Sequence, residues 1–244
     1  MSSAMNDPYL YEGSAVLRNL LNIRDEKELD LAEAELSRAS MMLLYEAGFN
    51  DFSTAGIKAI HRALFSSVYE WAGDFRTINI RKREAIIAGK SVWYSNDDDI
   101  DRDLNLAWDT IQSVKWGELS REAFAESLAR ALPALWQVHP FREGNTRTIV
   151  MLMTFFVESY GYYFDQELLA ASAGYVRNAF VMACLDQFSE YEHLERILCD
   201  AISDKPLVEV DDLDEDMTRE RSEKYSRYKT ENYQPVPHEY RGDE

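Results

Sequence analysis

Hydrophobic residues recur at helical spacing through the first third of the chain. They repeat every three or four positions in three segments, residues 16–21, 29–47 and 55–69. This period is that of an amphipathic α-helix, so three helices are predicted there. Gly48 and Asn50 are placed to end the second helix, and either Ser53 or Thr54 is placed to cap the third.

Helical patterns also cover most of the second half. Helices are expected over residues 97–111, 121–138, 146–157, 166–187 and 191–202. Pro133 should kink or divide its helix, because proline removes a backbone donor and clashes with the preceding turn. Residues 149–157 are apolar on nearly every side, which indicates a helix at the centre of a bundle.

One segment has a different period. Residues 77–80 alternate between polar and apolar, 81–84 form a charged turn, and β-prone runs follow up to Tyr94. This pattern predicts a β-hairpin over residues 77–94, which would be the single sheet of an otherwise all-α protein.

The composition changes after Pro206. Residues 206–244 are acidic, rich in charge and tyrosine, and poor in aliphatic side chains, which is typical of disorder. We therefore expect residues 1–205 to form one domain with an N-terminal extension. Residues 206–244 are expected to be a largely disordered tail with one helix around 218–228.

Charge restricts the partners. The 244-residue chain has 44 acidic and 26 basic residues, a net charge of −18, so neither nucleic acid nor an anionic membrane is an expected partner. No apolar run is long enough to cross a bilayer, and the first residues lack the pattern of an export signal. Cys184 and Cys199 lie in predicted helices and should be reduced, so a cytoplasmic protein is expected.

An unusual polar segment, His-Pro-Phe-Arg-Glu-Gly-Asn-Thr-Arg at 139–147, precedes the central helix. The first turn of a helix presents unpaired N–H groups and the positive end of the helix dipole. Gly144 and Asn145 let the backbone curl and approach a ligand. The helix start therefore predicts a phosphate-binding cradle.

Three side chains in this segment suit nucleotide chemistry. Arg147 can grip phosphate oxygens, and Glu143 is a ligand of the kind that Mg²⁺ accepts beside phosphates. His139 can accept a proton near neutral pH. A structural explanation stays open at this point, in which His139 caps the preceding helix and Glu143 and Arg147 form an i,i+4 ion pair.

The same residues resemble a known family. HPFREGNTR is similar to the Fic signature His-x-Phe-x-(Asp/Glu)-Gly-Asn-Gly-Arg, with Thr146 in place of the last glycine. The segments IHRALFSSVYEWAGDFRTINI and DPYLYEGSAVLRNLLNI also resemble this family, so the likeness extends over roughly residues 7–203.

The resemblance implies an all-α, Fic-type helical bundle with one short β-hairpin flap. It also implies transfer of AMP from Mg²⁺-bound ATP to a Ser, Thr or Tyr hydroxyl of a target protein. The residues matching the family's site are His139 as general base, Phe141 as core anchor, Glu143 as Mg²⁺ ligand, Gly144, Asn145 and Thr146 as anion cradle, and Arg147 as phosphate clamp. Arg177 is a further candidate for the nucleotide pocket, and the hairpin 77–94 would dock the target by strand addition.

The chain departs from the family pattern at Thr146 and at Val150, which stands where a second arginine is common. The family's inhibitory pattern, (Ser/Thr)-x-x-x-Glu-(Gly/Asn), has no match in the sequence, so a separate antitoxin-like protein or no restraint is expected. Two alternatives remain: a transferase with another nucleotide or phosphate-ester donor, or a catalytically weak module that binds proteins by its flap. His61, outside the motif, is expected to serve packing or hydrogen bonding.

Overall fold

A computed structural model describes residues 7–206 and 214–235 and confirms a helical fold. Its α-helices are α1 (Glu26–Ala47), α2 (Thr54–Phe65), α3 (Ile100–Gln112), α4 (Arg121–Val138), α5 (Asn145–Ser159), α6 (Gln166–Ala171), α7 (Ala173–Ala183), α8 (Glu192–Ala201) and α9 (Glu215–Ser226). Two short strands, β1 (Tyr163–Phe164) and β2 (Ile202–Ser203), pair antiparallel, with Tyr163 opposite Ser203.

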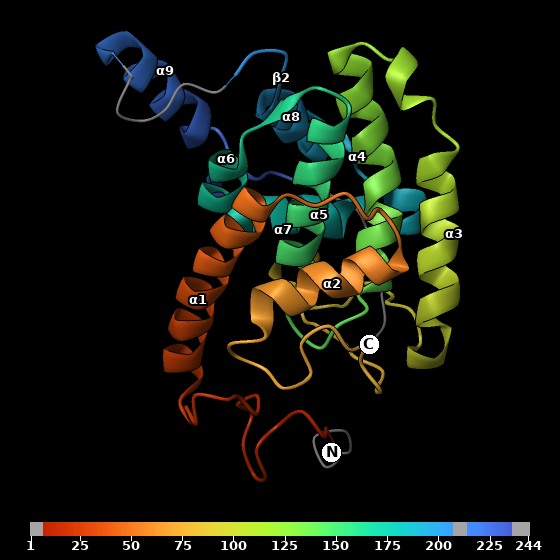
Figure 1. The fold of residues 1–244 in the computed structure, drawn as a ribbon, viewed down its shortest axis with the longest axis vertical. Coiled ribbons are helices and arrows are strands. Elements are labelled where there is room, and N and C mark those ends of the chain that lie inside the picture. The colour runs from red at the N-terminus through yellow and green to blue at the C-terminus, as the bar shows by residue number, and fades with distance from the viewer. Residues whose placement is uncertain (1–6, 207–213, 236–244) are drawn as a thin grey trace.

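Helix α5 lies in the middle of the bundle, with α2, α4 and α6 packed around it (Figure 1). Residues 148–157 are all buried, as their apolar character on every side requires. The predicted central helix is therefore confirmed, and its N-terminus points to the loop that carries the polar segment 139–144.

The predicted helix ends are confirmed at two positions. Gly48 ends α1 with a positive φ of 72°, and its N–H donates to the carbonyl oxygens of Leu44 and Tyr45. The Ser53 hydroxyl accepts a hydrogen bond from the Gly56 N–H at the start of α2. Helix α4 continues through Pro133, so this proline does not divide the helix.

Two predicted helices differ in the structure. Residues 16–21 are not helical, because the Asn19 side chain bonds the backbone of Leu17 and Ile23 and holds a loop instead. The single helix expected over 166–187 is two helices, α6 and α7, which meet at Ser172.

The segment 77–94 does not form the expected hairpin ladder. All of its residues are described, and the bridge pairing within it is limited to Glu84 and Lys90, which enclose a 3-10 turn at 85–87. Ile87 and Val92 turn inward and are buried. These inward contacts and the ion pairs described below outweigh the β-propensity that the alternating polar and apolar residues give the segment. The strands that do pair lie at 163–164 and 202–203.

The C-terminal segment 214–235 differs from the expected disorder. Its helix α9 overlaps the helix expected around 218–228, and the departure lies in its Tyr228 and Tyr233, which are 1% and 6% exposed against the body of the protein. Lys224 and Tyr225 both bond the Asp165 carboxylate, at 2.7 and 2.8 Å. The buried tyrosines therefore hold this otherwise polar segment against the body of the protein. Residues 207–213 and 236–244 of the predicted tail lie outside the described residues.

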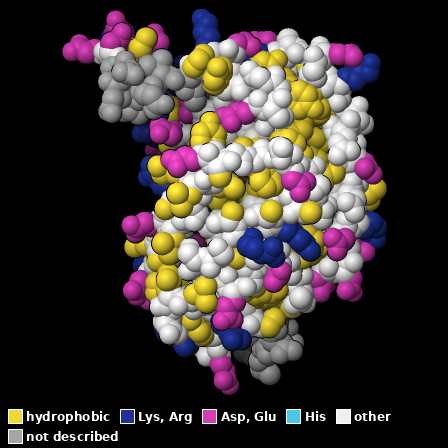
Figure 2. Space-filling model, in the orientation of Figure 1, with side chains coloured by type: hydrophobic (Ala, Val, Ile, Leu, Met, Phe, Trp, Pro, Cys, Tyr) yellow, Lys and Arg dark blue, Asp and Glu magenta, His cyan; other side chains and the backbone are white. Residues whose placement is uncertain are grey.

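The surface accords with the acidic composition. On the face in Figure 2, Asp and Glu side chains are scattered around the outline, and the described Lys and Arg side chains gather only in small groups. Within 7–206 and 214–235, the helices lack the combination of length and apolar composition that a bilayer span requires. Cys184 and Cys199 are free thiols, as expected.

Candidate active site

A cavity of about 1030 Å³ opens at the N-terminus of α5, between α1 and the α6–α7 pair. It collects the residues singled out from the sequence, namely His139, Glu143, Gly144, Asn145, Thr146, Arg147 and Arg177. Its remaining wall is mostly apolar and includes Leu29, Met41, Val150 and Val176. A mostly apolar cavity with a few convergent polar groups is the usual form of a small-molecule site.

His139 ends α4 in the left-handed region, with φ 50° and its N–H bonded to the Trp136 carbonyl. Its ring is 1% exposed and lies against the Tyr94 ring, with 4.1 Å between centroids. Neither ring nitrogen has a hydrogen-bond partner among the described residues. Burial, followed by the nearby Lys82 ammonium, lowers the pKa of His139 well below its usual value, so the ring is neutral at pH 7 and can accept a proton.

A buried guanidinium holds His139 in this unusual conformation. Arg76 is 2% exposed, and its side chain donates to the carbonyl oxygens of His139, Val138, Ile78 and Ser95. The first two belong to the end of α4, and the last two lie at the beginning of the segment 77–94 and just after its end. Arg76 therefore fastens the base of this segment to the backbone of the histidine.

Glu143 pairs with a residue that the sequence analysis did not single out. Its Oε2 lies 2.9 Å from the Lys82 Nζ, and its Oε1 accepts the Gly144 N–H at 3.0 Å. Burial alone would raise the pKa of Glu143, but Lys82 and the Gly144 N–H outweigh it and bring the pKa to about 2. The carboxylate is therefore ionised, and it does not pair with Arg147.

Three side chains brace the loop between His139 and α5. The Asn145 amide accepts from the Phe141 N–H at 2.9 Å and donates to the Phe141 carbonyl at 2.8 Å. His61 stacks on the Phe141 ring with 3.7 Å between centroids. The Asn145 side chain thus closes the loop, and only its backbone N–H is left to serve an anion.

His61 also has a defined tautomer. Its Nδ1 accepts the Gly73 N–H at 2.8 Å, so its Nε2 carries the proton and donates to the Glu143 carbonyl at 3.0 Å. The expectation of a packing and hydrogen-bonding histidine is confirmed.

The start of α5 has the form expected of an anion cradle. Gly144 has φ 81°, and a Cβ there would lie 2.4 Å from the Phe65 ring, so a glycine is required. The backbone N–H groups of the following first turn lack intrahelical acceptors, as at any helix start. The Thr146 hydroxyl accepts from the Trp136 indole at 2.9 Å, which draws its side chain toward α4.

Arg147 lies at the cavity but is not free. Its guanidinium pairs with the Glu33 carboxylate and donates to the Ser37 hydroxyl at 2.8 Å, both on α1. Glu33 is 7% exposed and also accepts the Tyr69 hydroxyl. Any anion that binds Arg147 must share the guanidinium with Glu33.

Arg177 makes a bidentate ion pair with Glu84 of the segment 77–94, at 2.7 and 3.0 Å. The Glu84 side chain is 5% exposed. This pair ties the segment to α7 on one side of the cavity, and the Lys82–Glu143 pair ties it to the central loop on the other. The segment therefore covers His139 in this structure.

Sequence reasoning missed Glu33, Arg76, Lys82 and Glu84. Lys82 and Glu84 belong to the charged run 81–84, which looks like an ordinary solvated hairpin turn. Glu33 sits in an amphipathic helix rich in charge, and Arg76 lies between a loop and a predicted strand. Nothing local marks these residues, because the cavity residues that they contact, His139, Glu143, Arg147 and Arg177, are 61 to 114 positions away in the sequence.

Glu143 is suited to Mg²⁺ in one respect. Mg²⁺ is commonly held by one or two carboxylates together with substrate phosphates, not by an all-protein cage. An ionised carboxylate beside the first turn of α5 fits this pattern, and the described residues contain no cluster of three or more His, Cys, Asp or Glu side chains that could hold a metal alone.

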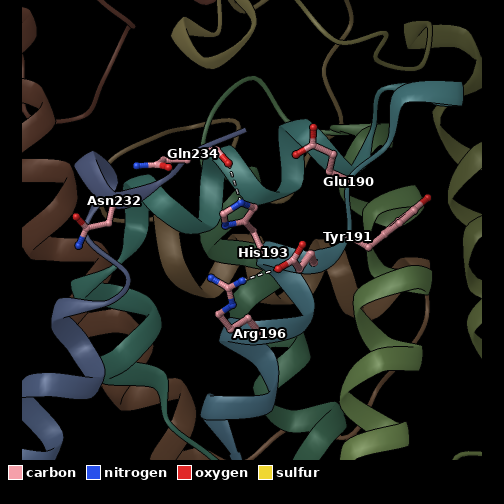
Figure 3. A pocket seen from close by; sticks show the side chains of 7 residues that line it. Glu190, Tyr191, His193, Arg196, Asn232 and Gln234 are labelled. Carbon is pink, nitrogen blue, oxygen red and sulfur yellow. Dashed lines mark hydrogen bonds and ion pairs between the residues drawn. The ribbon is translucent and has the colours of Figure 1, made fainter. Parts of the chain in front are cut away.

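A second, smaller hollow of about 440 Å³ lies between α8 and the C-terminal segment (Figure 3). His193 occupies its wall, with Nδ1 bonded to the Tyr175 hydroxyl at 2.5 Å and Nε2 to the Gln234 carbonyl at 3.2 Å. Its ring stacks on Tyr233 at 4.0 Å. These contacts are those of a docking seam, and the His193 nitrogens are already used.

Comparison with known proteins agrees with this geometry. Residues 51–157 match the Fic/DOC family. The chain is 35% identical over 173 residues to "Probable protein adenylyltransferase y4lH" of Sinorhizobium fredii, covering 68% of this chain and 83% of that protein. It is 29% identical over 188 residues to "Protein adenylyltransferase VbhT" of Bartonella schoenbuchensis, covering 74% of this chain and 38% of that protein.

A solved structure shares the fold. The N-terminal Fic domain of a VirB-translocated Bep effector protein from Bartonella quintana, with bound ADP, superposes with a TM-score of 0.69 at 25% identity. The match covers 80% of this chain and 94% of that one. Fold and site thus define a helical protein whose central helix begins beside a buried histidine in a cavity of nucleotide-sized volume. The chain belongs to the Fic family.

Proposed function

We propose that this protein is a protein adenylyltransferase, which transfers AMP from ATP to a Ser, Thr or Tyr hydroxyl of a target protein. The observation that carries the proposal is one cavity lined by the neutral His139, the ionised Glu143 and the first turn of α5. The adenylyltransferase names of the relatives support the same reaction.

In this proposal the target hydroxyl gives its proton to an unpartnered nitrogen of His139 and attacks the α-phosphorus. The bond to the β-phosphate oxygen breaks, and pyrophosphate leaves. Gly144, Asn145, Thr146 and Arg147 stabilise the phosphate charge through the helix start and the guanidinium. Glu143 would hold Mg²⁺, which would supply Lewis-acid stabilisation of that charge.

The partners and the setting belong to the same proposal. The target docks on the segment 77–94, which must release Tyr94 from His139 to admit a hydroxyl. Either a separate antitoxin-like protein inhibits the activity, or the activity is not inhibited. The reaction takes place in the cytoplasm, which supplies ATP and whose reducing conditions suit the two free thiols.

The test uses purified protein with Mg²⁺ and ATP labelled on the α-phosphate, with and without cell lysate. Wild type should transfer the label to protein, His139→Ala should lose at least about 100-fold of the rate, and ATP labelled on the γ-phosphate should leave no label. His193→Ala serves as the control for loss of a histidine outside the cavity. Transfer of the γ-label, or silence despite nucleotide binding, would refute AMP transfer and favour another donor or a binding module.

A further inference from the structure

Lys82 is a cation in the cavity that the proposed reaction has not used. Its ammonium lies 2.9 Å from Glu143, and its side chain is 17% exposed. It lines the same cavity as His139 and the first turn of α5, and its charge is one of the groups that act on His139. A lysine in a charged surface turn would instead be solvated.

The chain positions Lys82 from both sides. Its backbone N–H donates to the Ser91 hydroxyl at 3.2 Å, which ties together the two arms of the segment 77–94. Two residues later, Glu84 is fixed by its bidentate pair with Arg177. The side chain of Lys82 is therefore aimed at the cavity by backbone that is held in place.

Three of the four arginines that line the cavity have partners that nucleotide binding does not remove, and the fourth, Arg38 of α1, is exposed. Arg147 is paired with Glu33, and Arg177 with Glu84. Arg142 pairs with Asp7 at 2.9 Å. Val150, where the family resemblance leads one to expect a second arginine, contributes only an apolar surface to the cavity wall.

Lys82 differs because its partner is the carboxylate that the proposed function assigns to a metal ion. Once Glu143 serves as a ligand, the ammonium loses its counter-charge just where a polyphosphate brings several negative charges. A lysine stem is flexible enough for its ammonium to change partners without movement of the backbone.

We propose that Lys82 is a donor-binding residue, whose ammonium leaves Glu143 for the phosphates of the nucleotide and supplies the cation that Val150 does not. This assignment rests on the proposed function, since it takes the donor to be a nucleoside polyphosphate. The competing role for Lys82 is a lock that only blocks Glu143, and it predicts a change of affinity in the opposite direction.

Calorimetric titration of the full chain separates these roles without relying on activity. ATP, ADP and adenosine are titrated with Mg²⁺ into wild type, Lys82→Met and Lys82→Arg. Lys115→Met is the matched control, because it removes the same charge from a 77% exposed lysine outside the cavity. Circular dichroism and thermal melting check that each variant is folded.

Lys82→Met should weaken the binding of ATP and ADP about tenfold, the loss of one charge-assisted hydrogen bond, and should leave adenosine binding unchanged. Lys82→Arg should retain most of the affinity, and Lys115→Met all of it. Unchanged or tighter ATP binding by Lys82→Met would overturn the assignment, and so would an equal weakening for adenosine.

The outcome also distinguishes this assignment from the proposed function. If Lys82 is needed for ATP binding but wild type transfers no AMP, the assignment stands and the adenylyltransferase proposal fails. If wild type transfers AMP and Lys82→Met binds ATP normally, the reverse holds.

Discussion

At the scale of single residues, the site depends on titratable groups whose charge is set by burial and by their partners. His61 is fully buried, and burial lowers its pKa from 6.5 to about 4. Its neutral ring joins Gly73 to the Glu143 carbonyl, and so it fixes the loop that leads into α5. A proton on Nδ1 would remove the acceptor for the Gly73 N–H, so the fold favours the neutral form.

A pH-dependent loss of stability follows from His61. In the unfolded chain His61 takes up a proton near pH 6.5, whereas in the folded protein its pKa is about 4. The stabilisation from neutral His61 is therefore fully present above pH 6.5 and is lost as the pH falls to 4. The loss should approach about 1.4 kcal/mol per pH unit in this window. Urea unfolding from pH 7 to 4.5 measures it.

His61→Gln is the variant to compare. It should be less stable at pH 7, because the stacking on Phe141 is lost, but its free energy of unfolding should fall less steeply with acid. Equal slopes for variant and wild type would show that His61 is not the group responsible.

At the scale of elements, the segment 77–94 is held over His139 by charge pairs and not by a strand ladder. Lys82 ties it to the central loop, Glu84 ties it to α7, and Arg76 fastens its base to the end of α4. Side-chain contacts of this kind can be exchanged for contacts with a ligand or target, whereas a hairpin ladder would have to break its backbone hydrogen bonds. The segment can thus cover the histidine and still open.

Weakening one of these pairs should increase local opening. Glu84→Gln removes the buried carboxylate opposite Arg177, and amide hydrogen exchange at residues 80–92 should become roughly tenfold faster, a change of about 1.4 kcal/mol in local stability. Glu118→Gln, in an exposed pair with Lys115, should leave this exchange unchanged. Slow exchange in Glu84→Gln would mean that other contacts hold the segment.

At the scale of the whole molecule, the C-terminal segment completes the body of the protein. Thr230 packs against Gly174 so closely that a Cβ on the glycine would lie 2.2 Å from the threonine hydroxyl. Tyr225 forms part of the wall of the main cavity. The segment is therefore structural, and no glutamate from its described part, 214–235, is placed by these contacts on Arg147, whose partner is Glu33 of α1.

Deletion of residues 206–244 tests this structural role. The deletion would expose to water the surface that Tyr228 and Tyr233 cover. The loss of their burial should cost about 2 to 4 kcal/mol of stability, so the melting temperature should fall by several degrees. Self-modification measured with α-labelled ATP should not rise. A sharp rise in self-modification would show that this tail restrains the activity. Tyr228→Ala would then show whether the restraint depends on docking of the tail.

The sequence by itself determined most of the helices, the central place of α5 and the segment that carries His139, Glu143 and Arg147. These follow from local period, caps and spacing, which act within a few residues. The tertiary structure decided which charges meet: Glu143 with Lys82, Arg147 with Glu33, and Glu84 with Arg177. It also turned the expected hairpin into an irregular cover and docked α9, because burial and pairing between distant residues outweigh local propensity.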